Sequence, residues 1–411
     1  MPLFAYLDAG ETWHLAKMAL LFVGACAGHA ALLLAGLNWL YAQPLPHRLL
    51  SYTRKGDALL ILAGPLLFAF LFGVQHWLSL DPERSPALGV AFTAYLVLCC
   101  GIGYGVVPVV TLRRLLRREP AAVLEHRGEV VDVAAALGYK PAGDGKYRLA
   151  ARLPFNQVFQ VEFVERTLRL PRLPAAWDGL TILHLTDLHF CGTPDRHFYR
   201  HVLERCRAWG EPDLVAVTGD VVDGKRHHRW VVPLLGRLRW KVAGLAILGN
   251  HDQWYDPTLT RRRLRRIGLR VLDNRWEVLE VRGQPLVVVG HEGPWFRPGP
   301  DLTDCPPDVF RLCLSHTPDN IKWARRHGID LVLAGHVHGG QIRFPVVGSV
   351  LVPSRYSRKY DCGTFDEPPT LMHVSRGLAG QHPLRYNCRP EVTLLVLRAA
   401  GASVDRPHER V

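Results

Sequence analysis

The stretch TILHLTDLH at residues 181–189 is a short apolar run that ends in an aspartate and a histidine. Four later runs end in the same way, in clusters of Asp, His or Asn. They are Leu214 to Val217 before Gly219-Asp220, Leu245 to Leu248 before Gly249-Asn250-His251-Asp252, Leu312 to Leu314 before Ser315-His316, and Leu331 to Leu333 before Gly335-His336-Val337-His338. Apolar runs of this length between polar breaks are typical of buried β-strands.

Helical segments separate these runs, and the alternation predicts an α/β domain whose helices cover a sheet. The expected helices span residues 194–209, 227–238, 259–267 and 319–327. Ligands of open α/β sheets bind beyond the carboxyl ends of the strands. Because all five polar clusters follow such an end, we expect them to form one site.

The residue types in these clusters are those that bind divalent metals. A mixture of carboxylates, imidazoles and an amide suits Mn, Fe, Zn or Co better than Ca. Two such ions roughly 3.5 to 4 Å apart can activate a water and neutralise charge on a phosphate. The predicted ligands are Asp187, His189, Asp220, Asn250, His316, His336 and His338.

The motifs D-x-H, G-D-x-x-D, G-N-H-D, S-H and G-H-x-H, in this order, resemble the calcineurin-like metallophosphoesterase superfamily over about Leu170 to Leu397. The resemblance implies a β-sandwich flanked by helices. Further motifs are similar to its membrane-associated bacterial phosphodiesterase branch, which includes enzymes that cleave UDP-2,3-diacylglucosamine in lipid A synthesis. These motifs are Asp178-Gly179-Leu180, the sequence G-H-V-H-G-G-Q from Gly335 to Gln341, Pro353-Ser354, Lys359-Tyr360 and Cys388-Arg389-Pro390-Glu391.

The resemblance also implies two divalent ions, with Mn the expected metal and Fe, Zn or Co the alternatives. The first ion would be held by Asp187, His189 and His338, the second by Asn250, His316 and His336, and Asp220 would bridge them. The nucleophile would be the hydroxide between the metals, so no covalent phosphoenzyme is expected.

By the same resemblance, His251 would be the general acid that protonates the leaving oxygen. Either Asp223 or Asp252 would orient its ring. Asn250 would lie near the phosphate as well as on a metal.

Other residues are weaker candidates for contacts with the substrate. His291 ends the predicted strand that starts at Pro285, which places it near the same rim. Arg355 and Arg358 follow the G-H-x-H loop, where they either meet phosphate or form a solvated basic loop. Trp295 and Phe296 either cap a nucleobase or acyl chain or pack on their own loop.

The basic run from Arg261 to Arg266 is expected on a helix, where it either lies on anionic lipid headgroups or forms a solvated face. The net charge of +13 would also suit nucleic acid. We expect no nucleic-acid partner, because several positive charges flank apolar segments and aromatic residues do not alternate with the basic ones.

The first 112 residues contain three apolar stretches, at about 18–41, 58–78 and 87–112, each long enough to cross a bilayer. Basic residues favour one side of these spans, since Arg48, Arg54 and Lys55 lie between the first two and Arg113, Arg114, Arg117 and Arg118 follow the third. The opposite side has only Lys17 and Arg84. By the positive-inside rule the catalytic domain is cytoplasmic, at a bacterial inner membrane that the chain crosses several times.

The predicted organisation is a membrane domain at 1–112, a juxtamembrane connector at 113–173, the metallophosphoesterase domain at 174–400 and a flexible tail at 401–411. Within the connector, Val158 to Val164 and Thr167 to Leu170 read as an edge hairpin. The nine cysteines show no C-x-x-C spacing, and a Cys362 to Cys388 pair is left open.

Together these features predict a membrane-anchored hydrolase of phosphoester or pyrophosphate bonds in a lipid-linked substrate, with cleavage of UDP-2,3-diacylglucosamine to lipid X and UMP as the most specific form. One alternative is a broad phosphodiesterase of the cell envelope. Another is a membrane receptor or scaffold that kept the fold and lost the chemistry. The sequence does not define the oligomeric state.

Overall fold

A computed structural model describes residues 9–78 and 86–400. The predicted tail at 401–411, and Arg84 of the charge comparison, lie outside the described residues. The chain divides into two compact units, one of residues 1–41 and 45–117 and the other of residues 42–44 and 118–411. Each unit is described by itself.

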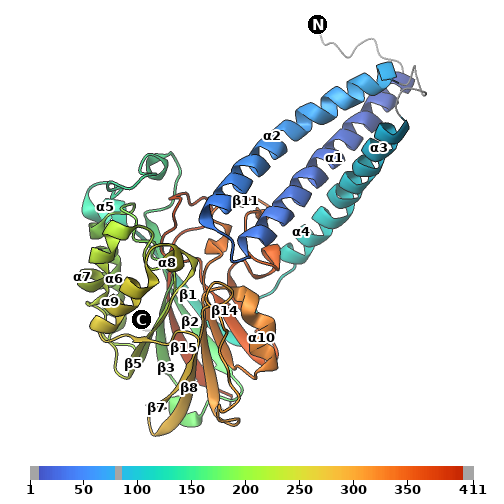
Figure 1. The fold of residues 1–411 in the computed structure, drawn as a ribbon. Coiled ribbons are helices and arrows are strands. Elements are labelled where there is room, and N and C mark those ends of the chain that lie inside the picture. Colours follow the sequence, from blue (N-terminus) through green and yellow to red (C-terminus); the bar gives the residue numbers. More distant parts are fainter. Residues whose placement is uncertain (1–8, 79–85, 401–411) are drawn as a thin grey trace, which may run out of the picture. The chain divides into compact units, whose positions relative to one another are not determined.

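The first unit is helical (Figure 1). It contains α1 (Ala9–Tyr41), α2 (His47–Leu78), α3 (Pro86–Gly101), a π-helical turn (Ile102–Val106) and α4 (Val107–Leu115). Among the described residues, two helical segments, Thr12–Tyr41 and Val90–Leu115, are long and apolar enough to cross a membrane. The span predicted at 58–78 lies within α2 and is not one of these two segments; the side chains of that helix are described only up to residue 70. Two of the three predicted spans are therefore supported.

The second unit contains two large sheets. The first has the strand order β1 (Val123–Asp132), β2 (Gln160–Leu170), β15 (Glu391–Ala399), β3 (Leu180–Leu185), β4 (Leu214–Thr218), β5 (Ala243–Ile247) and β6 (Arg270–Val271). The second has the order β13 (Gly363–Glu367), β14 (Thr370–Val374), β10 (Leu331–Ala334), β9 (Phe310–Ser315), β8 (Gln284–His291) and β7 (Trp276–Val281). A small hairpin joins β11 (Arg343–Phe344) to β12 (Gly348–Ser349).

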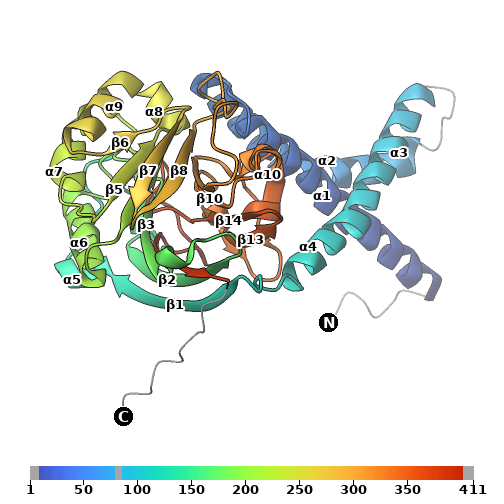
Figure 2. The same cartoon turned by 90° about the horizontal axis from the view of Figure 1, so that it is seen from below.

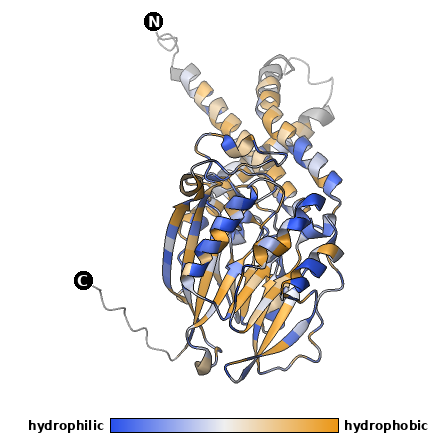
Figure 3. Cartoon of the chain, turned by 90° about the vertical axis from the view of Figure 1, so that its left-hand side faces the viewer, coloured by the Kyte–Doolittle hydropathy of each residue, from blue (hydrophilic) through white to orange (hydrophobic). Residues whose placement is uncertain are grey.

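Apolar side chains of the two sheets meet in one core, in which Ile182 and Leu245 of the first sheet accompany Leu312 and Leu333 of the second. The outer face of the first sheet packs on α6 (Arg196–Cys206), α7 (Val231–Leu235) and α9 (Pro257–Arg266), and that of the second on α10 (Ile321–Arg326) (Figure 2). The strands are mostly hydrophobic and the covering helices carry hydrophilic stretches (Figure 3). This confirms the predicted α/β sandwich flanked by helices.

Local predictions held best where the periodicity was strong. The expected helical segments contain α6, α7 and α10 and overlap α9, which begins two residues before its expected start, whereas the short helix α8 (Asn250–Trp254) is not among them. The predicted edge hairpin is wrong, because residues 160–170 form the single strand β2. That strand pairs antiparallel with β1 and parallel with β15, so hydrogen bonds to distant partners replace the predicted local turn.

Candidate metal centre

The five polar clusters meet at one end of the sandwich. Three of them follow β3, β4 and β5, which are parallel neighbours in the first sheet, and two follow β9 and β10, which are parallel neighbours in the second. The backbone at this edge is unusual, because five of the seven predicted ligands have a positive φ. They are Asp187, His189, Asp220, His336 and His338, with φ between 42° and 68°. Non-glycine residues rarely adopt this conformation, and clusters of them are typical of functional sites.

The first group of possible ligand atoms comprises Asp187, His189, Asp220 and His338. The Nε2 atoms of His189 and His338 lie 3.3 Å apart, and His189 Nε2 lies 3.5 Å from Asp220 Oδ2. Ligands about 2.0–2.2 Å from one ion are separated by about 3.0–3.5 Å from each other. The side chains are thus spaced as the ligands of a single metal.

The second group comprises Asp220, His316 and His336. His316 Nε2 lies 3.4 Å from Asp220 Oδ2 and 3.1 Å from Asn250 Oδ1, which adds the amide oxygen to the group. Asp220 belongs to both groups, as a bridging ligand must. Asp220 Oδ2 and His336 Nε2 are buried without a hydrogen-bond partner. Buried polar atoms are rarely left unpaired, so these two suit a metal between them.

Hydrogen bonds behind the ligands fix their orientation. His316 Nδ1 donates to the Thr218 carbonyl at 2.8 Å, and His338 Nδ1 donates to the Ala379 carbonyl at 3.1 Å. These bonds leave each Nε2 lone pair facing the site. Gly249 permits the close approach of the second group, because a Cβ at this position would lie 2.2 Å from Asp220 Oδ1.

His251 lies beside the ligands and is paired with Asp223. The distance between His251 Nδ1 and Asp223 Oδ1 is 2.9 Å. Burial alone would lower the pKa of His251, but the carboxylates of Asp223 and Asp220 raise it to about 9. Burial likewise opposes the charge of Asp223, but His251 and His189 hold the pKa of that carboxyl well below its usual value. The pair is therefore an imidazolium and a carboxylate near neutral pH.

Asp252 has a different function from the one left open by the sequence. Its carboxylate accepts backbone N–H bonds from Val221, Val222 and Gly249, at 3.0 to 3.2 Å. Burial and the neighbouring Asp220 raise its pKa to about 6. Asp223 therefore makes the bond to the His251 ring, and Asp252 joins the loops after β4 and β5.

Of the residues predicted to contact substrate, Asn250 lies in the second group, and three others lie outside both groups. The His291 ring packs edge-on against Trp323, with centroids 4.6 Å apart, and its Nδ1 accepts a bond from Asn320 at 3.1 Å. Arg358 donates to the carbonyls of Val347 and Ser349. Arg355 is exposed, and its backbone N–H bonds to Asp319. Their substrate roles remain predictions.

The loop after β8 supplies a wall for the second group. The Trp295 ring is 5% exposed and lies 4.7 Å from the His336 ring and 5.4 Å from the His316 ring, centroid to centroid. The basic run on α9 is partly neutralised here, because Arg261 pairs with the buried Glu292 and with Asp273.

Sequence reasoning missed Arg385, which is 1% exposed. Its guanidinium donates to the carbonyls of His338, Arg376 and Ala379 at 2.6 to 3.1 Å, so it ties the loop of a predicted ligand to the loop after β14. Nothing local in the sequence indicates this role, which depends on three loops meeting. All nine cysteines are free, and the Cys362 to Cys388 bond is not formed.

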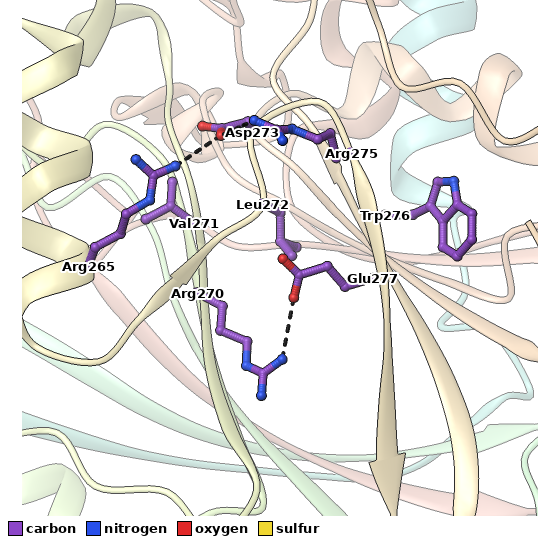
Figure 4. Close-up of a pocket in the computed structure, with 8 residues that line it drawn as sticks. All are labelled: Arg265, Arg270, Val271, Leu272, Asp273, Arg275, Trp276 and Glu277. Atoms are coloured by element: carbon purple, nitrogen blue, oxygen red, sulfur yellow. Dashed lines mark hydrogen bonds and ion pairs between the residues drawn. The ribbon is translucent and has the colours of Figure 1, made fainter.

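A recess of about 520 Å³ lies between the edge strands β6 and β7 (Figure 4). Its charged residues pair with one another, Arg265 with Asp273 at 3.0 Å and Arg270 with Glu277 at 3.4 Å. None of the metal-centre residues lines it, so it is a separate feature of the surface.

Comparisons with known proteins agree with this geometry. Residues 180–340 match the model of the calcineurin-like phosphoesterase family. The uncharacterized metallophosphoesterase YkuE of Bacillus subtilis is 29% identical over 277 residues, 65% of this chain and 95% of that protein. Phosphodiesterase YaeI of Escherichia coli is 31% identical over 224 residues, 53% of this chain and 81% of that protein. The UDP-2,3-diacylglucosamine pyrophosphatase LpxG of Chlamydia trachomatis is 30% identical over 107 residues, 24% of this chain and 32% of that protein.

The fold, the shared carboxylate and these relatives define a metal-dependent hydrolase of phosphoesters. The chain belongs to the calcineurin-like phosphoesterase family.

Proposed function

We propose that the chain is a membrane-anchored hydrolase that cleaves a phosphodiester or pyrophosphate bond in a lipid-linked substrate. The observation that carries the proposal is the carboxylate of Asp220, shared by two buried ligand groups in a chain with two helices apolar enough to cross a bilayer. The specific candidate is UDP-2,3-diacylglucosamine, cleaved to UMP and lipid X. The similarity of 107 residues to LpxG supports this candidate.

Asp187, His189 and His338 would hold one divalent ion and Asn250, His316 and His336 the other, with Asp220 between them and Mn the expected metal. When bound, the two ions supply Lewis acidity toward the phosphate and toward water.

His251 supplies the proton for the leaving group. Its Nδ1 is engaged by Asp223, so Nε2–H is the donor toward substrate. In the reaction, the oxygen of water forms a bond to phosphorus, and the bond between phosphorus and the leaving oxygen breaks. The water keeps one proton as the new hydroxyl on phosphorus and releases the other to solvent, from which His251 is later reprotonated. The proton on Nε2 moves to that oxygen, which leaves as an alcohol or as the protonated phosphate. The carboxylate of Asp223 keeps His251 protonated until this step.

The membrane placement is also a proposal. The chain would cross a bacterial inner membrane three times, with α2 as the middle span, and Arg113, Arg114, Arg117 and Arg118 would keep the catalytic unit cytoplasmic. A C-terminal fusion tests the side: green fluorescent protein should fluoresce, and periplasmic alkaline phosphatase should stay inactive. The opposite pair of results would place the unit outside.

Two other functions are weaker. A broad phosphodiesterase of the cell envelope is favoured by the similarity to phosphodiesterase YaeI. An inactive scaffold is disfavoured, because the full ligand set and the His251–Asp223 pair are both assembled.

The decisive experiment measures turnover by the full chain in detergent with Mn, using UDP-2,3-diacylglucosamine, phospholipids and a simple nitrophenyl diester. We expect release of UMP from the first substrate, its loss in Asp220→Ala and its retention in His197→Ala, an exposed histidine on α6. Hydrolysis of simple diesters alone would favour the broad phosphodiesterase.

A further inference from the structure

Two loops of the catalytic unit expose apolar side chains at their ends. The first loop, residues 149–155, lies between α5 (Val133–Leu137) and β2, and the second is the hairpin of β11 and β12 with its extension to residue 351. We call their six exposed side chains the apolar tips. They are Leu149, Leu153, Phe155, Phe344, Val346 and Leu351, with exposed fractions of 71%, 46%, 90%, 52%, 64% and 42%.

The backbone at the tips makes these side chains more unusual. Phe155 has a φ of 59° and Val346 a φ of 64°. Glycine, asparagine and aspartate are the residues that normally occupy such positions in exposed turns, and a β-branched residue there is rare. Each loop therefore places a large apolar residue where an exposed turn ordinarily has a small or polar one.

Hydrogen bonds join the two loops into one surface. Tyr386 donates its hydroxyl to the Pro154 carbonyl at 3.1 Å, and the Tyr386 carbonyl accepts the Arg343 N–H at 2.9 Å. Asn156 donates to the Pro383 carbonyl at 2.8 Å. The segment from Pro383 to Tyr386 thus holds one loop on each side.

The same segment reaches the metal centre. Arg385 N–H donates to Asn156 Oδ1 at 2.9 Å, while the Arg385 guanidinium donates to the carbonyl of His338 at 3.1 Å. Gln341, which precedes β11, donates its N–H to the same carbonyl at 3.1 Å. The apolar tips are therefore anchored on a predicted metal ligand.

Basic side chains outnumber acidic ones around the tips. Residues 139–157 contain four basic side chains, Lys140, Lys146, Arg148 and Arg152, and the single acid Asp144. Residues 341–360 contain four basic side chains, Arg343, Arg355, Arg358 and Lys359. Two of them are paired, Arg343 with Asp361 at 3.1 Å and Lys359 with Glu367 at 2.7 Å. Apolar side chains flanked by Lys and Arg are typical of surfaces that enter the interface of an anionic bilayer.

We propose that the apolar tips insert into the headgroup region of an anionic phospholipid bilayer and hold the metal centre close to the lipid. The bilayer is the fitting occupant because the tips combine exposed apolar side chains with an excess of basic ones nearby, and because the same chain has two helical segments apolar enough to cross a membrane. The contact does not depend on which substrate is cleaved.

Tryptophan substitution tests the contact in the full chain. Phe155→Trp and Val346→Trp place a fluorophore at each tip, and Val278→Trp places the control on β7, where Val278 is 47% exposed. Each variant is reconstituted in nanodiscs of phosphatidylcholine with about a quarter phosphatidylglycerol, with and without bromine on the acyl chains. We expect bromine to quench the added fluorescence of both tip variants by about half and to leave that of Val278→Trp unchanged.

Equal quenching of tips and control would overturn the proposal. Absence of quenching at the tips, with a blue shift that grows with protein concentration in detergent, would overturn it in favour of a second copy of the chain as the occupant.

A double variant separates this contact from the proposed function. Asparagine suits a positive φ, so Phe155→Asn with Val346→Asn should fold with an unchanged melting temperature. We expect KM for bilayer-embedded substrate to rise at least fivefold while kcat on a soluble diester stays within twofold; an unchanged KM would contradict the contact. If no lipid is hydrolysed by the parent chain, the proposed substrate fails, and the quenching result still decides the contact.

Discussion

Replacing Asp223 by Asn removes the charge that keeps His251 protonated, but it retains an oxygen that accepts the Nδ1–H bond. The two side chains lie 2.9 Å apart, with Asp223 buried and His251 13% exposed. Burial lowers the pKa of His251, and the two carboxylates raise it from 6.5 to about 9. That difference corresponds to about 3 kcal/mol in favour of the imidazolium. Most of this stabilisation should be lost in the variant.

The sign of the pH effect follows from the raised pKa. His251 is protonated below about pH 9 and loses its proton above it, so turnover of the native chain should fall as the pH rises through about 9. In Asp223→Asn this fall in turnover should occur at lower pH. At pH 8 the variant should lose on the order of 100-fold in kcat/KM, within the range of about 10²–10⁴ attributed to general acids.

The assay compares pH profiles on two substrates. A diester with an alkoxide leaving group needs the proton and should show the full loss, whereas one with a nitrophenolate leaving group needs little help and should lose less than fivefold. Asp252→Asn is the matched control, because that carboxylate is buried nearby but bonds backbone N–H groups. The assignment of His251 as the acid would be refuted if the fall in turnover at high pH occurs at the same pH in Asp223→Asn as in the native chain. It would also be refuted if that fall shifts equally in Asp223→Asn and Asp252→Asn.

Three further predictions follow from the packing. Gly249→Ala should lower turnover more than tenfold, since its Cβ would lie 2.2 Å from Asp220 Oδ1, while Gly56→Ala, with nothing within 4 Å, should not; equal activities would contradict the steric argument. Arg385→Met should leave buried carbonyls unpaired and destabilise the fold by about 3 kcal/mol. The melting temperature should fall in this variant and recover in part in Arg385→Lys. An unchanged melting temperature in Arg385→Met would contradict the prediction. Asp252→Asn should cost about 1–2 kcal/mol of stability through the loss of an acceptor, measured by denaturant unfolding, and a stability equal to that of the native chain would show that its three bonds are dispensable.

Most of the site can be predicted from the sequence, because the ligands follow short apolar strands. A run such as TILHL determines both the strand and the position of the polar residues after it, and parallel pairing of β3, β4 and β5 then brings those residues together. The shared position of Asp220 and the place of His251 beside the ligands could be anticipated from the resemblance that the ordered motifs carry.

Features that depend on long-range pairing could not be predicted from the sequence. The sequence of β2 predicts a hairpin because it contains two short runs of alternating apolar and polar residues. Its actual partners, β1 and β15, include a strand far away in the chain, which no local pattern indicates. The choice between Asp223 and Asp252 needed three-dimensional geometry, because Asp252 is next to His251 in the chain, whereas Asp223, 28 residues away, makes the bond to its ring. Arg385 and the apolar tips carry no local signal, since their roles arise from loops that meet only in the fold.

The metal content of the chain shows most directly whether Asp220 joins a pair of metal ions. The full chain, loaded with Mn in detergent and freed of excess metal, should contain about two equivalents by mass spectrometry, with electron paramagnetic resonance showing coupled ions. Asp220→Ala should bind less than one equivalent and show no coupling, while His197→Ala should match the native chain. Two coupled ions in Asp220→Ala, or a single uncoupled ion in the native chain, would contradict the account.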